Sequence, residues 1–179
     1  MIRTIFRDKD KCIGCTACII ACKNEHELPP YPTIPPEHAP KGPSFITLYH
    51  KRPEVIEDRV EQYFLPISCM HCIDAPCIRA CPRQAIYRDE NMGAVLVEKN
   101  RCIGCRFCLW FCPYGAPRFD TEGKMIKCDL CIDRIKEGKK PMCEQTCPSY
   151  AIIIGTPEEI GEAKGQQIME RIEAGGSLF

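Results

Sequence analysis

Sixteen cysteines in four groups of four constrain this chain of 179 residues more than any other feature of its sequence. The first two groups are Cys12-x2-Cys15-x2-Cys18-x3-Cys22 and Cys69-x2-Cys72-x4-Cys77-x3-Cys81. The last two are Cys102-x2-Cys105-x2-Cys108-x3-Cys112 and Cys128-x2-Cys131-x11-Cys143-x3-Cys147. No cysteine is left over, so each group supplies four thiols, the number of ligands that a structural zinc ion or a four-iron cluster takes.

The third group is followed by Pro113 and matches, residue type for residue type, the C-x2-C-x2-C-x3-C-P run of bacterial ferredoxins. In that run three cysteines wrap a loop around one cubane, and the fourth, a helical turn further on, binds the other cluster of the pair. Gly14 and Gly104 stand in matching Cys-Ile-Gly-Cys loops, where we expect them to let backbone amides approach the cluster sulfurs. The spacing thus predicts four [4Fe–4S] clusters.

Structural zinc and a disulfide framework are the alternatives for cysteine at this density. Zinc needs only pairs of Cys-x2-Cys and gives no reason for a fourth cysteine followed by proline. Disulfides between cysteines this close along one segment would be strained.

The N-terminus, MIRTIFRDKD, lacks the apolar region of a secretory signal, and no apolar run is long enough to span a bilayer. We therefore expect a cytoplasmic protein with no direct membrane insertion, made where cysteines are more often metal ligands than disulfides. Export together with a signal-bearing partner is the alternative.

The charges of the side chains balance, with 24 Lys and Arg against 24 Asp and Glu, which argues against nucleic-acid binding. Four clusters with their thiolates would bring the total to roughly −8. That excess explains why cations stand beside the cysteines, although solvated surface charge is the alternative for each of them: Lys11, Arg79, Arg83, Arg101, Arg106 and Lys127.

Internal similarity divides the four groups into two types. The KCIGC run at 11–15 resembles RCIGC at 101–105, so groups one and three are of one type. CPRQAI at 81–86 resembles CPSYAI at 147–152, so groups two and four are of the other type. Groups two and three are joined by a predicted β-hairpin, as in a two-cluster ferredoxin, with strands at Ala85–Arg88 and Ala94–Val97 and a turn at Asp89–Gly93.

This pairing predicts an inner ferredoxin-like module at 66–118, and an outer one from 1–30 and 119–155 that holds groups one and four. Exchanging the fourth cysteines within each module gives four ligand sets. Set I is Cys12, Cys15, Cys18 and Cys147, and set II is Cys22, Cys128, Cys131 and Cys143. Set III is Cys69, Cys72, Cys77 and Cys112, and set IV is Cys81, Cys102, Cys105 and Cys108.

The segment 31–65 is predicted to be an insert. Leu28–Pro43 holds seven prolines and should be extended and stiff, either as a surface connector or as an arm that contacts a partner. Alternating residues predict a hairpin from Ser44–His50 and Val60–Ile67. Between Cys131 and Cys143 we expect a helical turn closed by Gly138.

The tail, 156–179, opens with a capping box at Thr156 and Glu159 and with Pro157 at the first helical position, so we expect a helix that runs to about Ala174. Its apolar stripe packs either on its own chain or on a partner: Ile160, Ala163, Ile168, Met169 and Ile172. The expected fold class is α+β, with two interleaved, loop-rich ferredoxin-like modules of two clusters each, a hairpin insert and a C-terminal helix.

Few residues outside the cysteines could carry chemistry. The histidines have no metal-ligand spacing, and His71, beside Cys72, is expected to hydrogen-bond near a cluster. Trp110, Phe111 and Tyr114 flank Cys112 and are expected to shield a cluster from water. A phosphate-binding glycine loop, a nucleophile elbow and paired carboxylates are all missing from the sequence, so we expect no catalytic site in this chain.

Three further motifs accompany the cysteines: Phe64-Leu65-Pro66-x2-Cys69-x-His71-Cys72, Cys112-Pro113-Tyr114-Gly115-Ala116 and Cys128-x2-Cys131-x2-Arg134. With them the chain, from about Ile2 to Gly155, resembles the four-cluster β subunits of the dimethyl sulfoxide reductase family of molybdenum and tungsten enzymes. The resemblance implies the pairing above and an electron-transfer subunit that is not itself an enzyme. It also implies that set I lies nearest a molybdenum- or tungsten-pterin catalytic subunit and that set IV lies at the far end.

Some relatives replace the second cysteine of the third group and assemble a different cluster there, but Cys105 is present here. Larger relatives carry a C-terminal extension that meets a membrane anchor, whereas this chain ends soon after its last motif. The compact form is similar to small subunits of soluble tungsten enzymes of anaerobes, namely aldehyde oxidoreductase and class II benzoyl-CoA reductase. A further redox subunit or a ferredoxin is a possible partner at the far end, and the alternative function is a free polyferredoxin.

Overall fold

The computed structural model describes residues 2–28, 44–56 and 59–174. The first half holds β1 (Thr4–Arg7), α1 (Ala17–Glu25), β2 (Thr47–Ile56), β3 (Arg59–Ile67), α2 (Pro76–Arg79), β4 (Ile86–Arg88) and β5 (Val95–Val97). After a 3-10 turn, Lys99–Arg101, come α3 (Phe107–Trp110), β6 (Arg118–Phe119), β7 (Met125–Ile126), α4 (Ile132–Lys136), α5 (Met142–Gln145), β8 (Ile152–Gly155) and α6 (Pro157–Glu173). Short helices and antiparallel two-stranded sheets joined by long loops confirm the α+β class.

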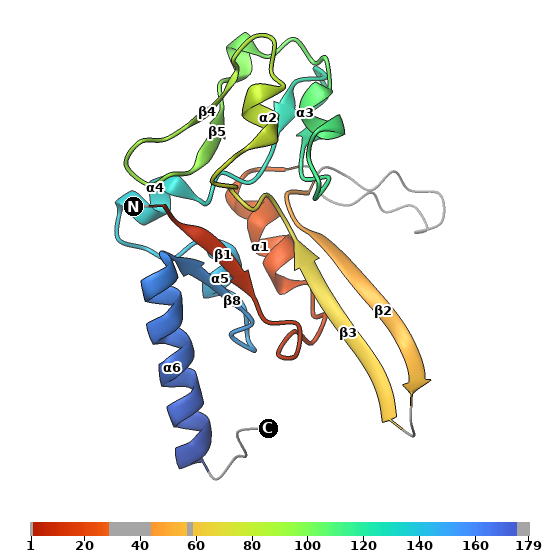
Figure 1. The fold of residues 1–179 in the computed structure, drawn as a ribbon, viewed down its shortest axis with the longest axis vertical. Helices are drawn as coiled ribbons and strands as arrows, with labels where there is room; N and C mark the ends of the chain where they lie inside the picture. The colour runs from red at the N-terminus through yellow and green to blue at the C-terminus, as the bar shows by residue number, and fades with distance from the viewer. Residues whose placement is uncertain (1, 29–43, 57–58, 175–179) are drawn as a thin grey trace.

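The two ends of the chain meet in one sheet, where β1 pairs antiparallel with β8 from Thr4↔Gly155 to Arg7↔Ile152 (Figure 1). Buried isoleucines of both strands, Ile5 of β1 and two of β8, form a core with residues of α1 and α4. This pairing brings cysteine group one, in the loop before α1 and in α1 itself, together with group four, in the segment before β8.

The predicted hairpin between groups two and three is confirmed, because β4 pairs with β5 from Ile86↔Val97 to Arg88↔Val95. The Asp89 carboxylate accepts backbone hydrogen bonds from Asn91 and Met92 and so closes the turn. A second apolar cluster forms under this hairpin and includes Phe119 and Met125 of β6 and β7. These two residues therefore pack on the inner half, beyond the boundary at 118 that the sequence favours.

The second predicted hairpin is also present, formed by β2 and β3 and paired from Thr47↔Ile67 to Ile56↔Arg59. Its first strand begins and ends later than expected, at Thr47–Ile56 rather than Ser44–His50, and it carries a register irregularity between Lys51 and Glu54. The hairpin projects away from the rest of the chain (Figure 1). The proline-rich prediction, apart from Leu28, lies outside the described residues.

The C-terminal helix α6 begins as predicted. The Thr156 side chain accepts a hydrogen bond from the backbone N–H of Glu159, and the Glu159 carboxylate accepts one from the backbone N–H of Thr156. The helix ends at Glu173 with Ala174 as its C-cap, close to the predicted end. Only the start of the apolar stripe is buried, at Ile160, whereas Ile168, Met169 and Ile172 are exposed.

The other local predictions can be checked in the same way. The segment after Cys131 is a short helix, α4, followed by Gly138 at a positive φ of 73°, which confirms the expected helical turn. Among the helices of the described segments, none combines the length and apolar character that crossing a membrane requires.

Candidate metal centres

The thiols of set I and those of set IV line two separate cavities. One cavity has Cys12, Cys15, Cys18 and Cys147 in its wall, together with Leu48 and Pro66 of the β2–β3 hairpin. The other has Cys81, Cys102, Cys105 and Cys108 in its wall, together with Phe119 and Met125. The structure thus brings together the residues of set I and those of set IV, although each set combines cysteines from two groups.

Sets II and III lie in the interior, and their grouping is visible in the electrostatics. Burial raises the pKa of Cys22, and the charges of Cys128, Cys143 and Cys131 raise it further. Burial likewise raises the pKa of Cys77 to about 11, with Cys69, Cys112 and Cys72 adding to the effect. Each of these two thiols therefore feels the three partners that the exchange of fourth cysteines assigns to it.

The same electrostatics give the order of the sets. Burial raises the pKa of Cys143, and among the charges that add to it is Cys18 of set I. Burial raises the pKa of Cys128 to about 12, and Cys69 of set III adds to it. Burial raises the pKa of Cys108 to about 11, and Cys77 of set III contributes. The sets therefore neighbour one another in the sequence I, II, III, IV.

The crowding of these thiols is unfavourable in the absence of a metal cluster and favours binding of one. Thiols that are buried and crowded by other thiols resist ionisation near neutral pH, yet the thiolate is the form that binds iron. A cationic core placed among four sulfurs removes both penalties, since it compensates the negative charge and displaces the protons. The donor set of four thiols in each case is the one that [4Fe–4S] clusters take.

Two cations, the buried Lys127 and the partly buried Arg7, give independent support for a negatively charged group at these sites. Arg7 donates to the Ser68 hydroxyl and to the Met70 sulfur, 3.0 Å from Nη1, and Lys127 donates to the carbonyl oxygens of Val95 and Cys128. Neither forms an ion pair with Asp or Glu within the described part of the chain. A buried charge without a counter-charge is costly, so anionic groups are expected beside both.

Cysteines of three sets contribute to the electrostatic environment of Arg7. Burial lowers the pKa of Arg7, whereas the charges of Cys128, Cys143, Cys18 and Cys69 oppose that shift. Arg7 therefore lies among sets I, II and III. Sequence reasoning named Lys127 but missed Arg7, because only the pairing of β1 with β8 places that residue among the cysteines.

The first Cys-x2-Cys loop of each of the four groups shares one backbone feature, a positive φ at the residue before its second cysteine. These residues are Gly14, His71, Gly104 and Leu130, with φ of 70°, 48°, 71° and 65°. The left-handed conformation is natural for glycine and strained for leucine, so the loop geometry is imposed by its surroundings.

The two glycines also avoid close contacts. A Cβ on Gly14 would lie 2.6 Å from the Phe64 ring, and one on Gly104 would lie 2.7 Å from the carbonyl oxygen of Gly123. Their close packing is thus against protein atoms, while the approach of their amides to cluster sulfurs stays a prediction.

A second repeated feature holds the fourth cysteine of groups two, three and four. The backbone N–H of the alanine four residues later donates to its sulfur, from Ala85 to Cys81 at 3.3 Å, from Ala116 to Cys112 at 3.4 Å and from Ala151 to Cys147 at 3.3 Å. The residue before each alanine has a positive φ, which turns the amide back toward the sulfur. The Cys-Pro-x2-Ala run is the sequence signal for this hydrogen bond, which the sequence reasoning did not predict.

His71 is buried between the modules, where its Nδ1 accepts a hydrogen bond of 2.9 Å from the backbone N–H of Val95. Its other nitrogen therefore carries the proton of the neutral ring. Burial lowers the pKa of His71 well below its usual value, and the charges of Lys127, Arg88 and Arg7 lower it further. The ring is therefore neutral near pH 7, and His71 lies next to Cys72 of set III in the sequence.

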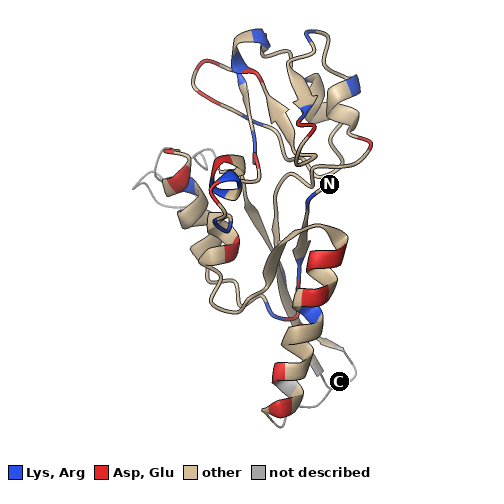
Figure 2. Ribbon diagram, turned by 90° about the vertical axis from the view of Figure 1, so that its left-hand side faces the viewer, with Lys and Arg blue, Asp and Glu red and all other residues tan. Residues whose placement is uncertain are grey.

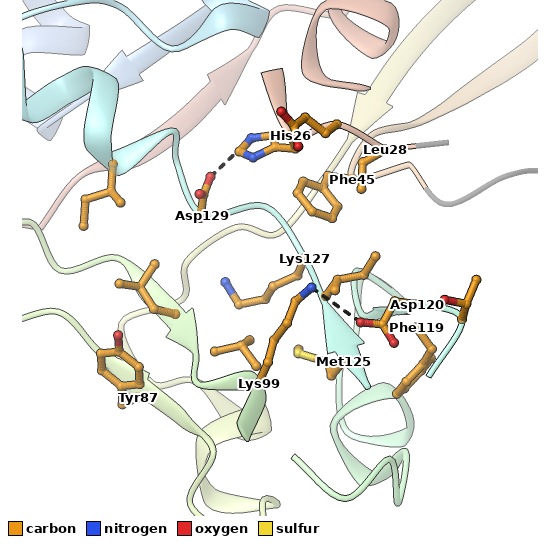
Figure 3. A pocket seen from close by; sticks show the side chains of 16 residues that line it. His26, Leu28, Phe45, Tyr87, Lys99, Phe119, Asp120, Met125, Lys127 and Asp129 are labelled. Atoms are coloured by element: carbon orange, nitrogen blue, oxygen red, sulfur yellow. Dashed lines mark ion pairs between the residues drawn. The ribbon is translucent and has the colours of Figure 1, made fainter. Parts of the chain in front are cut away.

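His26 was not singled out by its spacing, yet it lies beside set II. Its Nε2 is 3.4 Å from the Asp129 carboxylate and 3.6 Å from the Cys131 sulfur. The three ligand atoms lie within 4.8 Å of one another, but Cys131 already belongs to set II. His26 and Asp129 also border a cavity of about 660 Å³ between the two halves (Figure 3). None of the sixteen cysteines lines that cavity.

The expectation that aromatic residues near Cys112 shield a cluster is wrong for Trp110. Helix α3 is a single turn that ends at this residue, and the Trp110 side chain is 85% exposed. Phe111 and Tyr114 are exposed as well. All three aromatic side chains are therefore open to solvent in the isolated chain.

Comparison with known proteins agrees with this geometry. Residues 60–157, which include twelve of the cysteines, match the family model described as a 4Fe-4S dicluster domain. The B component of the anaerobic dimethyl sulfoxide reductase of Escherichia coli (strain K12) is 39% identical over 161 residues, which cover 89% of this chain and 76% of that protein.

Two other relatives are subunits of enzymes that are named for different compounds, sulfite and thiosulfate. The B component of the sulfite dehydrogenase of Allochromatium vinosum is 36% identical over 179 residues, covering 92% of this chain and 72% of its own. Thiosulfate reductase electron transfer subunit PhsB of Salmonella typhi is 36% identical over 158 residues, covering 87% and 76%. From its cysteine sets and from these relatives, this protein belongs to the [4Fe–4S] electron-transfer subunits of molybdenum-enzyme reductases and dehydrogenases, which relay electrons to a catalytic subunit and are not catalytic themselves.

Proposed function

We propose that this subunit holds four [4Fe–4S] clusters, one in each of sets I to IV, and relays single electrons along that series. The observation that carries the proposal is the succession of four thiol sets, each assembled from two cysteine groups and each next to the following one. A [4Fe–4S] cluster, when bound, accepts and releases one electron at a time. The two interleaved modules are the halves that carry sets I and II and sets III and IV.

The chain's own residues would fix the positions and the environment of these groups. The cysteine loops hold the sulfurs, and the backbone N–H groups of Ala85, Ala116 and Ala151 donate to three of them. Arg7 and Lys127 offset negative charge in the interior. Hydrogen bonds, burial and nearby charge set the reduction potential of a cluster, so these residues would tune the relay.

The mouth of the set I cavity favours a permanent protein contact. Among the described residues that line this cavity there is no charged side chain, and Ile13 in its wall is 62% exposed. Tyr150, between Ser149 and Ala151 of this wall, is exposed as well, and so are Val55 and Val60 on the projecting β2–β3 hairpin, although that hairpin also carries charged residues such as Lys51 and Glu61. Contiguous exposed apolar residues mark interaction sites. We therefore place a molybdenum- or tungsten-pterin catalytic subunit at set I, in an anaerobic complex whose cytoplasmic location stays a prediction.

Metal analysis of the anaerobically purified complex tests the cluster count. Four cubanes require about sixteen iron and sixteen acid-labile sulfide per copy of this subunit, after the iron of the catalytic partner has been subtracted. About twelve iron and twelve sulfide per copy would mean that one of the four sets holds no [4Fe–4S] cluster, and this would refute the proposed count. Iron-free protein that contains zinc would instead support a structural module, and its lack of sulfide-to-iron absorbance would show this at once.

A further inference from the structure

The mouth of the set IV cavity has a chemistry of its own. Arg83 and Arg106 lie in its wall, and both are exposed, as is the ligand Cys105. Among the described residues that line it there is no Asp or Glu. Figure 2 shows Lys and Arg on the loops at this end of the molecule.

Neither arginine is neutralised by a neighbour in the described segments. Arg106 stacks its guanidinium over the Phe119 ring, 5.3 Å from the centroid, and neither residue forms an ion pair with a carboxylate. The neighbouring arginines differ, because Arg79 pairs with Asp74 and Arg101 lies 3.6 Å from Glu98. Two unpaired positive charges therefore flank the exposed ligand of set IV.

Exposed aromatic side chains stand beside these charges. Phe107, Trp110 and Phe111 lie on or directly after α3, the turn that follows Arg106, and all three are exposed. Tryptophan and arginine are the residue types that dominate binding energy in protein interfaces. A surface of this composition fits a protein partner better than a small solute.

The charges indicate what kind of protein it is. Thiolates at an exposed cluster make the site negative and would repel an acidic partner, and Arg83 and Arg106 offset that repulsion. Opposite charges around a docking patch steer association and can raise its rate by orders of magnitude at low salt. A basic patch around an exposed redox ligand is complementary to an acidic patch on a one-electron carrier.

We propose that the surface formed by Arg83, Ile103, Arg106, Phe107, Trp110 and Phe111 docks a small acidic electron-carrier protein of the ferredoxin type. The inference rests on the proposed relay and names its partner at set IV. One electron leaves the reduced carrier, which is oxidised by one electron, and enters the subunit, which is reduced by one electron. The exchange is reversible and requires no proton transfer.

The test uses the anaerobic complex with the variant Arg83→Glu/Arg106→Glu. Stopped-flow absorbance measures the second-order rate constant for reduction by a reduced acidic two-cluster ferredoxin at several ionic strengths, and calorimetry measures the Kd of the oxidised ferredoxin. In the wild type the rate constant falls as salt rises. In the variant it falls at least about tenfold at low salt and no longer decreases with salt, and the Kd rises similarly.

Matched variants separate charge from misfolding. Lys136→Glu, on α4 outside this surface, changes both values less than about twofold, because an exposed charge away from the docking surface is largely screened by salt. Arg83→Gln/Arg106→Gln gives an intermediate effect. A basic cytochrome c, used as an electron acceptor from the reduced complex, reacts faster with the Glu variant. Unchanged ferredoxin kinetics, or equal slowing with both carriers, would overturn the docking proposal.

Photoreduction with a deazaflavin, which loads electrons without a docked protein, keeps the two proposals apart. If the photoreduced complex fails to deliver electrons to its catalytic subunit, the relay itself is refuted. If delivery succeeds while the ferredoxin rate is independent of both arginines, only the docking site is refuted.

Discussion

The two ends of the proposed relay differ although their metal sites are built alike. Both have a Cys-Ile-Gly-Cys loop with an exposed second cysteine, Cys15 in set I and Cys105 in set IV. Around Cys15 the cavity wall is uncharged and abuts the β2–β3 hairpin, whereas around Cys105 it carries two unpaired arginines.

The difference shows how one repeated motif serves two kinds of contact. An uncharged apolar surface favours a lasting subunit interface, because its burial releases water and needs no charge partner. A charged mouth favours rapid and reversible encounters, because electrostatic steering raises association rates more than affinity. The loop fixes the metal site, and the residues between and after the cysteines select the partner.

The largest expected effect comes from removing one exposed ligand at each end. Cys15→Ser should abolish electron exchange with the catalytic subunit while leaving reduction by ferredoxin, whereas Cys105→Ser should do the reverse. The cause is that each variant disables a different terminal set. Rapid-freeze EPR with reduction from either side measures both steps, and loss of the same step in both variants would remove the distinction between the ends.

A smaller effect is expected from the two loop glycines. Gly104→Ala forces a Cβ against the Gly123 carbonyl, which is backbone, whereas Gly14→Ala meets the Phe64 side chain. Three atoms of the Phe64 ring, Cγ included, lie within 2.7 Å of the added Cβ, so the whole ring must move. Because both positions also have φ near +70°, we expect losses of about 2–4 kcal/mol for either variant. Anaerobic thermal unfolding with iron retention measures both, and Gly161→Ala, with open space around it in α6, is the control.

The hairpin should matter to one end only. Val55 and Val60 pair across β2 and β3 and are 71% and 69% exposed. We expect Val55→Ser/Val60→Ser to weaken association with the catalytic subunit about tenfold, by loss of apolar contact. Trp110→Ala, at the other end, should leave that affinity unchanged in the same co-purification or calorimetric measurement. The reverse pattern would exchange the two assignments.

The smallest effect is expected from a change in the middle of the relay, at sets II and III, which lie between the two terminal sets. Replacing Lys127 with Met removes a buried positive charge beside sets II and III. Loss of this charge disfavours the reduced clusters and should lower their potentials by about 50–100 mV. For a one-electron couple, about 59 mV corresponds to a tenfold change in the equilibrium constant. EPR-monitored titration measures the shift. Lys124→Met, whose ammonium pairs with Glu122 at 3.4 Å on the surface, should change the potentials by less than about 15 mV.

Features that depend on a few neighbouring residues could be predicted from the sequence. Alternating and turn residues gave both hairpins, and the Thr156–Glu159 capping box gave the start of α6. Ferredoxin spacing indicates which thiols share a loop, and the thiols of sets I and IV line common cavities, while the assignment of ligands to clusters stays a prediction. These signals are local and require no knowledge of the rest of the fold.

Features that depend on distant pairing could not be predicted. Arg7 becomes a central cation only because β1 pairs with β8, and nothing near it in the sequence indicates this. Leu130 adopts a left-handed conformation that its residue type disfavours, so only its surroundings explain it. Trp110 looks like a core residue by type, but the single turn of α3 leaves it exposed.

The most direct test of the central claim, a series of four clusters with exchanged fourth ligands, is the EPR and Mössbauer spectrum of Cys112→Ser. Cys112 follows Cys108 closely in the sequence, but Cys69, Cys72 and Cys77 are its expected partners. We predict that the signal of the set III cluster is lost or converted, while the set IV cluster held by Cys102, Cys105 and Cys108 keeps its spectrum and potential. Loss of the set IV signal with set III intact would show that Cys112 binds with its sequence neighbours and would contradict the series.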